Sequence, residues 1–256
     1  ERITQACLAL QAAVALCPES HGITDPGSWL QLGCAYANEG RLVAARRALL
    51  RAAAAPCYVH EPVVLTTLGS VERRLGLLDK AKTRFQATIA SSEAKCGVSD
   101  LEALGKLVSG TSTANDSLLQ QALSTLLCGL HGFADICLTQ SFHWVAVGAS
   151  ALAAAQLAEG WRAVQRALAI LHGVNPGADQ ESSTCNVFTV DALEMRGLVL
   201  KLGGDLLGQA YRLGPADVAG AFVNVSLSLP GGVSAECAEA ALVQESEAQT
   251  GDNAKP

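Results

Sequence analysis

The chain has 256 residues and a formal net charge of −6; half of its residues are hydrophobic and only 16% are charged. This composition excludes intrinsic disorder for most of the chain, because disorder requires low hydrophobicity and high charge. Aromatic residues make up only 4%, so the apolar content is mostly Ala, Leu and Val, which favours helices over a β-sandwich. Neither half of the chain carries the strongly basic surface that binding to nucleic acid requires.

Hydrophobic periodicity predicts a series of helices in the first half, separated by glycine and proline. The stretch 91–116 is more polar. In it we expect a short helix over residues 100–108 and then a linker over residues 109–116. The preceding helices are predicted over residues 3–17, 28–40, 42–54, 62–75 and 78–90, with Pro18, Gly40, Pro56 and Gly76 as breaks.

The second half has the same helical character with weaker regularity. Residues 222–229 alternate like a strand, although their context favours a helix. Residues 245–256 contain acidic residues and no apolar period, which predicts a flexible acidic tail. We therefore predict a repeat-like helical domain over residues 1–108 and a second region of helical hairpins over residues 117–244. The linker over residues 109–116 separates them, and the acidic tail follows. Helices are predicted over residues 117–130, 134–157, 161–171, 187–202, 206–213, 215–227 and 234–244.

A repeat of 36 residues is the most informative feature of the chain. Small residues would leave room where two antiparallel helices cross, and glycine would make the turn between them. Such a pair must stack on a neighbour to bury its faces. The first copy contains Trp29, Leu32, Gly33, Tyr36, Gly40, Ala45, Leu49, Ala52 and Pro56. The second copy contains Leu65, Leu68, Gly69, Gly76, Ala81 and Phe85 at the same spacing.

This pattern resembles the tetratricopeptide repeat (TPR). Leu49 stands in place of the usual Phe, and Glu72 stands where the first copy has Tyr36. The clear resemblance covers residues 27–90, with weaker copies over Trp144–Pro176 and Val190–Tyr211. It implies an α-solenoid of stacked antiparallel helical hairpins, with an irregular helical region towards the C-terminus.

In this family the first helix of each pair lines a concave groove where partner peptides lie. The resemblance therefore implies a scaffold or adaptor that binds other proteins within a multiprotein assembly. The family's clamp for the acidic C-terminus of a heat-shock chaperone needs Lys and Asn where this chain has Leu30 and Cys34, so that partner is disfavoured. By register, the groove residues are Leu30, Cys34, Ala37, Asn38, Thr66, Ser70, Arg73 and Arg74.

Arg73 and Arg74 are the only cations in this predicted set. They could meet an acidic segment of a partner. Two solvated arginines near the favourable C-terminal dipole of a helix are the simpler interpretation.

No motif in the sequence indicates an enzyme, a cofactor or a metal site. Histidine pairs spaced for zinc, a Walker loop and a nucleophile elbow are all missing. We attribute the proximity of Cys128, His131 and Cys137 to chance in a chain with nine cysteines. Most cysteines lie among Ala and Leu, as buried free thiols do, which predicts a reducing intracellular compartment, the cytoplasm.

Two alternative functions remain open. The low charge of residues 118–171 is typical of a surface that is buried in a complex, so the chain could be a permanent structural subunit whose groove is filled by a partner. It could instead be a helical enzyme or a small-ligand-binding bundle with its site in residues 117–171. The uncharged run Ile136–Ala158 is long enough to span a membrane, but its polar residues argue against a span.

Overall fold

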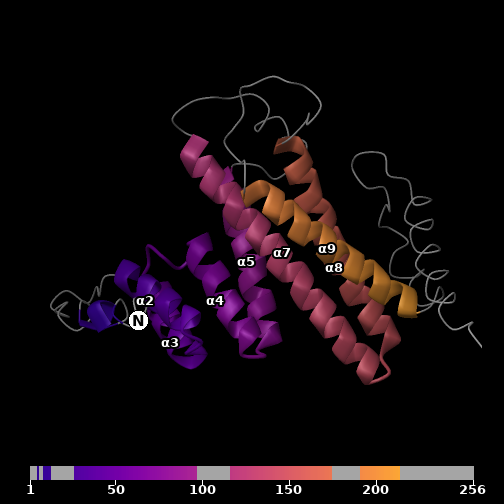
Figure 1. Cartoon of the computed structure of the whole chain (residues 1–256), viewed down its shortest axis with the longest axis horizontal. Helices are drawn as coiled ribbons and strands as arrows, with labels where there is room; N and C mark the ends of the chain where they lie inside the picture. Colours follow the sequence, from indigo (N-terminus) through magenta and orange to yellow (C-terminus); the bar gives the residue numbers. More distant parts are fainter. Residues whose placement is uncertain (1–4, 6–7, 13–25, 97–115, 175–190, 214–256) are drawn as a thin grey trace, which may run out of the picture.

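The computed structural model describes residues 5, 8–12, 26–96, 116–174 and 191–213. All regular structure in these ranges is helical, so the prediction of an all-α protein is confirmed for this part of the chain. The helices, drawn in Figure 1, are α2 (Pro26–Asn38), α3 (Leu42–Ala54), α4 (Pro62–Arg74), α5 (Leu78–Cys96), α7 (Asp116–Ala146), α8 (Ser150–Val174) and α9 (Asp191–Leu213).

Several predicted segments lie outside the described residues. They are the short helix over 100–108, the helices over 215–227 and 234–244, the candidate strand over 222–229 and the acidic tail. The same holds for all but the ends of the predicted linker, and for most of the predicted helix over 3–17.

The helices of the first half begin and end close to their predicted limits. Pro62 occupies the first turn of α4, where its missing N–H costs no hydrogen bond. α5 is longer than predicted, because it runs to Cys96 instead of ending at Ala90. Its last turns are anchored on α7, since the hydroxyl of the buried Ser92 lies 3.1 Å from the Thr125 hydroxyl.

The predicted division of the second half is wrong. Residues 116–146 form one helix and residues 150–174 form another, where the periodicity predicts three helices with breaks near Gly132 and Gly160. Residues 191–213 likewise form one helix that passes through the expected break near Gly204. The actual break lies at Gly148, between α7 and α8.

Gly132 and Gly160 are packing positions, not breaks. A Cβ on Gly132 would lie 2.4 Å from the Phe85 ring of α5, and a Cβ on Gly160 would lie 3.0 Å from the Cys137 Cβ. Each glycine costs a helix about 1 kcal/mol relative to alanine. The helices keep these glycines because a neighbouring side chain occupies the space that a Cβ would need.

Three of the turns between helices share one backbone geometry. Gly40, Gly76 and Gly148 have φ values of 78°, 76° and 78°, in the left-handed region that favours glycine. Each glycine N–H donates to the carbonyl three residues earlier, at 3.1, 2.9 and 3.0 Å, and the next N–H donates to the carbonyl five residues before it, at 2.9, 2.9 and 2.8 Å. This pair of hydrogen bonds is the Schellman motif, which satisfies the last carbonyls of a helix.

The α7–α8 turn extends the same series. Gly148 follows Gly76 by 72 residues, which is twice the 36 residues between Gly40 and Gly76. Ala153 and Leu157 on α8 therefore take the places of the buried Ala81 and Phe85, and they are themselves fully buried. The predicted third copy starting at Trp144 is wrong, because Trp144 lies in the last turn of α7.

The helices pack in adjacent pairs. α2 packs on α3, α4 on α5 and α7 on α8, and the three pairs meet through α3 with α4 and α5 with α7. Their first helices also touch one another, α2 with α4 and α4 with α7, and the single helix α9 packs on α8 and α7 (Figure 1). Among the described helices, the extensive contacts thus lie within a pair or between neighbouring pairs.

The buried core follows this series of helices. Its largest cluster lies between α7, α8 and α9 and includes Leu157 and Leu206, and a second cluster lies between α2, α3 and α4 around Leu49. Phe85 of α5 packs against Gly69 of α4 and Gly132 of α7 and is 2% exposed. Burying this ring contributes about 2–3 kcal/mol to stability. The contact holds the α4–α5 pair against α7 of the α7–α8 pair.

A buried ion-pair cluster joins the first two pairs. Glu72 of α4 is fully buried, in the place where the first copy has Tyr36. Its carboxylate lies 2.9 Å from Arg46 Nε of α3 and 3.7 Å from Arg84 Nε of α5. Because a buried carboxylate without partners is costly, this cluster favours one register of α3, α4 and α5.

Among the described helices, α7 alone is long and apolar enough to cross a membrane by length and composition. The segment is Gln121–Ala146, with a mean hydropathy of 1.4, and 56% of its apolar window is buried in a helix that packs on α4, α5, α8 and α9. The uncharged run Ile136–Ala158 is not one helix, because the Gly148 turn divides it between α7 and α8.

Candidate functional site

Four of the predicted groove residues lie on α2, and one of them is exposed. Leu30 is half-buried against the apolar cluster of the first two pairs, and Ala37 is buried. Cys34 is half-buried and hydrogen-bonds to Thr67 of α4, while burial raises the pKa of its thiol. Asn38, the last residue of α2, is exposed.

The two predicted groove arginines bind neighbouring helices. Arg73 Nε lies 2.5 Å from a carboxylate oxygen of Asp135 on α7. Arg74 Nη1 donates a hydrogen bond of 2.9 Å to the Ala37 carbonyl of α2. Both side chains remain exposed on one side, but an acidic partner would have to compete with these contacts. The two arginines therefore join α2, α4 and α7 in one row.

The remaining two predicted residues on α4 differ in accessibility. Thr66 is half-buried, and its hydroxyl donates to the Pro62 carbonyl at 2.7 Å and lies 3.3 Å from the Thr88 hydroxyl of α5. Ser70 is exposed. The open positions on the predicted face of α2 and α4 are thus Asn38, Ser70 and the outer parts of the two arginines.

Sequence reasoning missed the continuation of this face onto α7. The shared turn places Leu138, Phe142, Val145 and Ala146 at the positions of the groove residues of the first two copies. Leu138 is buried, but Phe142 is 48% exposed and Val145 is 40% exposed. The spacing of 72 residues between Gly76 and Gly148 was the signal in the sequence that would have found them.

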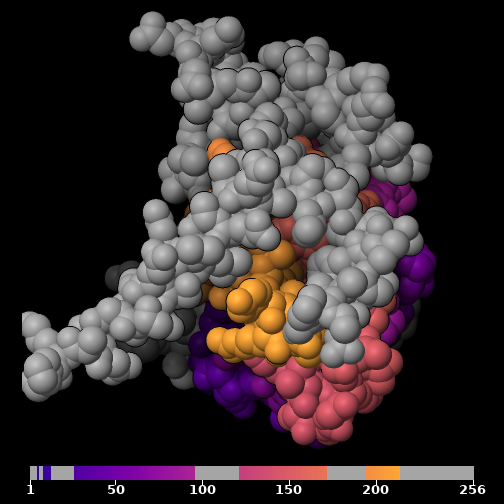
Figure 2. All heavy atoms as spheres, turned by 90° about the vertical axis from the view of Figure 1, so that its right-hand side faces the viewer, coloured from indigo at the N-terminus to yellow at the C-terminus, as the bar shows by residue number. Residues whose placement is uncertain are grey.

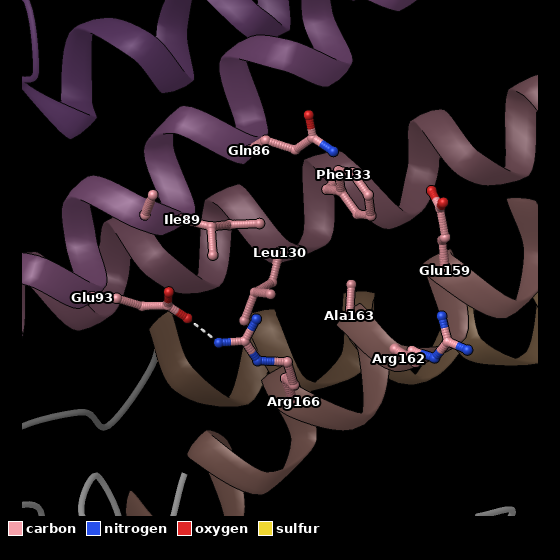
Figure 3. Close-up of a pocket in the computed structure, with 10 residues that line it drawn as sticks. Gln86, Ile89, Glu93, Leu130, Phe133, Glu159, Arg162, Ala163 and Arg166 are labelled. Atoms are coloured by element: carbon pink, nitrogen blue, oxygen red, sulfur yellow. Dashed lines mark hydrogen bonds and ion pairs between the residues drawn. The ribbon is translucent and has the colours of Figure 1, made fainter. Parts of the chain in front are cut away.

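A separate hollow of about 400 Å³ lies between α5 and α8, with α7 as its floor (Figure 3). Its apolar walls are made by Ile89 and Ala90 of α5, Leu130 and Phe133 of α7, and Ala163 of α8. Gln86, Glu93, Glu159, Arg162 and Arg166 form its polar rim. Part of it lies in residues 117–171, where the sequence leaves a ligand site open as an alternative.

Ion pairs between α5 and α8 close the two ends of the hollow. At one end Arg166 pairs with Glu93, and burial lowers the pKa of the Arg166 guanidinium. At the other end Lys82 Nζ lies 2.7 Å from Glu159, and 5.4 Å from the centre of the Phe133 ring.

Arg162 lies between these two ends. It is exposed and forms no ion pair with a described residue. The lining side chains comprise two cations and two carboxylates. Because Glu159 pairs with Lys82, which lies outside the lining, and Glu93 pairs with Arg166, Arg162 is the lining cation without a carboxylate partner among the described residues.

The cysteine and histidine residues singled out in the sequence do not form a metal site. No group of three His, Cys, Asp or Glu suited to a metal occurs within the described ranges. Burial raises the pKa of the Cys128 thiol, raises that of Cys137 to about 12, and lowers the pKa of His131. The two thiols are accordingly protonated at neutral pH.

No protein-family model matches the chain, and no curated protein matches it either. The TPR resemblance therefore depends on the residues quoted for the first two copies.

Proposed function

We propose that the chain is a protein–protein interaction scaffold, built as an α-solenoid of TPR-like helix pairs and acting within a larger multiprotein assembly. The observation that carries the proposal is the repeated Schellman turn at multiples of 36 residues, at Gly40, Gly76 and Gly148. The serial contacts of α2, α4 and α7 support it, because stacked pairs place their first helices side by side.

The face formed by these first helices supports a partner that is bound by shape and apolar contact. Its open positions are Asn38, Ser70 and the outer parts of Arg73 and Arg74 on the first two pairs, and Phe142 and Val145 on the third. The Arg73 charge is already compensated by Asp135. The face therefore offers no cluster of free cations for an acidic chaperone tail, and we keep that partner as disfavoured.

Site-specific photo-crosslinking in the native cell tests the scaffold function. A benzoylphenylalanine at Asn38 or Ser70 should capture the same small set of proteins. Matched controls at Arg47 of α3 and Lys80 of α5, both exposed on second helices, should capture a different set or none. Identical captures from all four positions, or no capture from Asn38 and Ser70, would contradict the proposal. If every copy of the chain crosslinked to one partner, and the chain could not be purified without that partner, the alternative of a permanent structural subunit would be favoured.

The hollow between α5 and α8 favours a second candidate function, the binding of a small apolar anion. Its volume lies within the range of ligand pockets. Apolar walls would hold the body of such a ligand, and the uncompensated Arg162 would meet its charge. No group in the hollow is arranged for catalysis, so we propose binding there and not a reaction.

Titration with 1-anilinonaphthalene-8-sulfonate, an apolar anion, tests the hollow. Arg162→Gln should weaken binding by about tenfold, the equivalent of 1.4 kcal/mol, because it removes the free charge. Ala163→Leu should abolish binding by filling the space. Arg196→Gln, on an exposed position of α9, is the matched charge control. Equal affinity in all variants would rule out this site.

A further inference from the structure

The end of the α7–α8 pair is an apolar projection of the described structure. Four of its large side chains are exposed: Phe142 by 48%, Val145 by 40%, Val147 by 59% and Leu152 by 51%. No charged residue occurs from 136 to 158. Figure 2 shows this end, in salmon, at the lower edge of the molecule beside α9.

The other two turns of the series show that the apolar composition is not required by the backbone. The three turns have the same φ at glycine and the same hydrogen bonds. Where the third turn has Val145, Ala146 and Leu152, the α4–α5 turn has Arg73, Arg74 and Lys80, and the α2–α3 turn carries Glu39 and Arg41. Two charged versions and one uncharged version of one turn thus occur in a single chain.

The exposed apolar side chains of this end belong to three successive elements. Phe142 and Val145 lie on α7, Val147 lies in the turn, and Leu152 lies on α8. A peptide along the first helices would cover Phe142 and Val145 and leave Val147 and Leu152 in water. The apolar region of a lipid interface would cover all four together.

Three N–H groups of the turn are already hydrogen-bonded within the protein. The N–H groups of Val147, Gly148 and Ala149 donate to carbonyls at the end of α7, at 3.2, 3.0 and 2.8 Å. An unsatisfied N–H would make insertion costly, and these three need no water. The half-buried Trp144 lies one turn from the tip, and tryptophan is enriched at the boundary between lipid and water.

We propose that the α7–α8 end inserts shallowly into the interface of a lipid bilayer, without spanning it. The driving force is burial of apolar side chains, because this end has the exposed His143 but no Lys or Arg to attract anionic lipid, and the chain has a net charge of −6. Binding to zwitterionic vesicles should therefore be insensitive to salt. The inference does not depend on the proposed scaffold function. If both hold, Phe142 and Val145 contact lipid, and the partner lies on the exposed positions of α2 and α4, at Asn38 and Ser70.

Vesicle flotation with the full chain and phosphatidylcholine vesicles tests this insertion. The double variant V145R/L152K should reduce the bound fraction by on the order of tenfold, because charged side chains resist insertion. This variant copies Arg73 and Lys80, which the same turn already carries in the second pair. The matched control is V43R/L198K, which places equal charge on exposed apolar positions of α3 and α9 and should float like the wild type.

A second readout locates the contact on the chain. Brominated phosphatidylcholine should quench part of the tryptophan fluorescence of the wild type, and Trp144→Phe should lose that quenching. Thermal unfolding monitored by circular dichroism verifies that the variants are folded. Absence of flotation in the wild type, or equal flotation of V145R/L152K, would overturn the proposal. A change from dimer to monomer in V145R/L152K without vesicle binding would overturn it too, because the apolar end would then contact protein.

Discussion

At the scale of single residues, what faces a glycine decides its role. Gly132 and Gly204 both lie inside helices of the second half. A Cβ on Gly132 would collide with the Phe85 ring at 2.4 Å, whereas a Cβ on Gly204 would meet no atom within 4 Å. The two glycines have the same propensity, so their difference comes from packing alone.

We expect Gly132→Ala to lower the free energy of unfolding by about 1–3 kcal/mol, because overpacking at Phe85 outweighs the gain in helix propensity. Gly204→Ala, the matched control, should raise it by about 0.5–1 kcal/mol. Urea unfolding followed by circular dichroism measures both values. If the two variants were equally stable, the ring would not be tightly held between α5 and α7.

Burial also sets the chemistry of the thiols. Cys137 is fully buried, and burial raises its pKa from the ordinary 9.0 to about 12, whereas Cys57 is exposed. Since the thiolate is the reactive form, we expect iodoacetamide at pH 8 to modify Cys137 on the order of a hundredfold more slowly than Cys57. Peptide mapping by mass spectrometry measures the two rates, and comparable rates would contradict the buried position.

The same shift predicts a pH dependence of stability. When the pH rises above 9, the unfolded chain loses the Cys137 proton before the folded chain does, because the folded pKa is about 12. The free energy of unfolding therefore falls between pH 9 and 12. Cys137→Ala should remove this part of the slope, which urea unfolding across that range would detect.

At the scale of helices and turns, one hairpin connection serves three pairs of different composition. The residues before the turn glycine differ, with Tyr36, Glu72 and Trp144 at equivalent positions. Even so, the hydrogen bonds agree to within 0.2 Å. The left-handed glycine and its two hydrogen bonds therefore suffice to end each first helix.

Replacing Gly40, Gly76 or Gly148 by Ala should cost about 1–2 kcal/mol each, because an L side chain is strained in the left-handed region. The effects should add, since the three turns belong to different pairs. Gly197→Ala, at a helical position with open space, is the control and should not destabilise. Thermal or urea unfolding of the single and triple variants measures the change in the free energy of unfolding. If Gly148→Ala left this free energy unchanged, the α7–α8 turn would not depend on glycine as the other two turns do.

At the scale of the whole molecule, the packing is serial. α7 contacts helices of the pair before it and α9 after it, whereas α2 and α3 make extensive contacts only with each other and α4 among the described helices. Stability in such an arrangement is a sum over units and their interfaces. Local opening should then differ along the chain.

Hydrogen exchange should be slowest in α4 and α7 and faster in α2 and α3. Among the described helices, α4 and α7 have neighbours on both sides, whereas α2 and α3 pack only on each other and on α4. Exchange followed by mass spectrometry resolves the helices individually. The Phe85→Leu variant should speed exchange in α5 and α7 more than in α2. Uniform protection over all helices would indicate one cooperative unit and would contradict serial packing.

Local signals in the sequence predicted much of the fold. Gly40, Gly76 and the Ala–Leu periodicity around them predicted the first two pairs nearly to their ends, and composition predicted helices elsewhere. The candidate face was predicted only in part. Its residues on α2 and α4 were named, but Phe142 and Val145 were missed because the helix predicted over 134–157 ran through Gly148, the turn that sets the register of α7.

The sequence by itself determined the helical class, the 36-residue series in the first two pairs and the lack of a metal or nucleotide motif. These features depend on backbone preferences and on short spacings, so residues close together in the sequence are enough to determine them. The tertiary structure decided which glycines are turns and which are packing positions, because Gly132 is understood only from Phe85, far away in sequence. It also decided that Arg73 pairs with Asp135 and that charged rims enclose a hollow between α5 and α8, since both require helices brought together by packing.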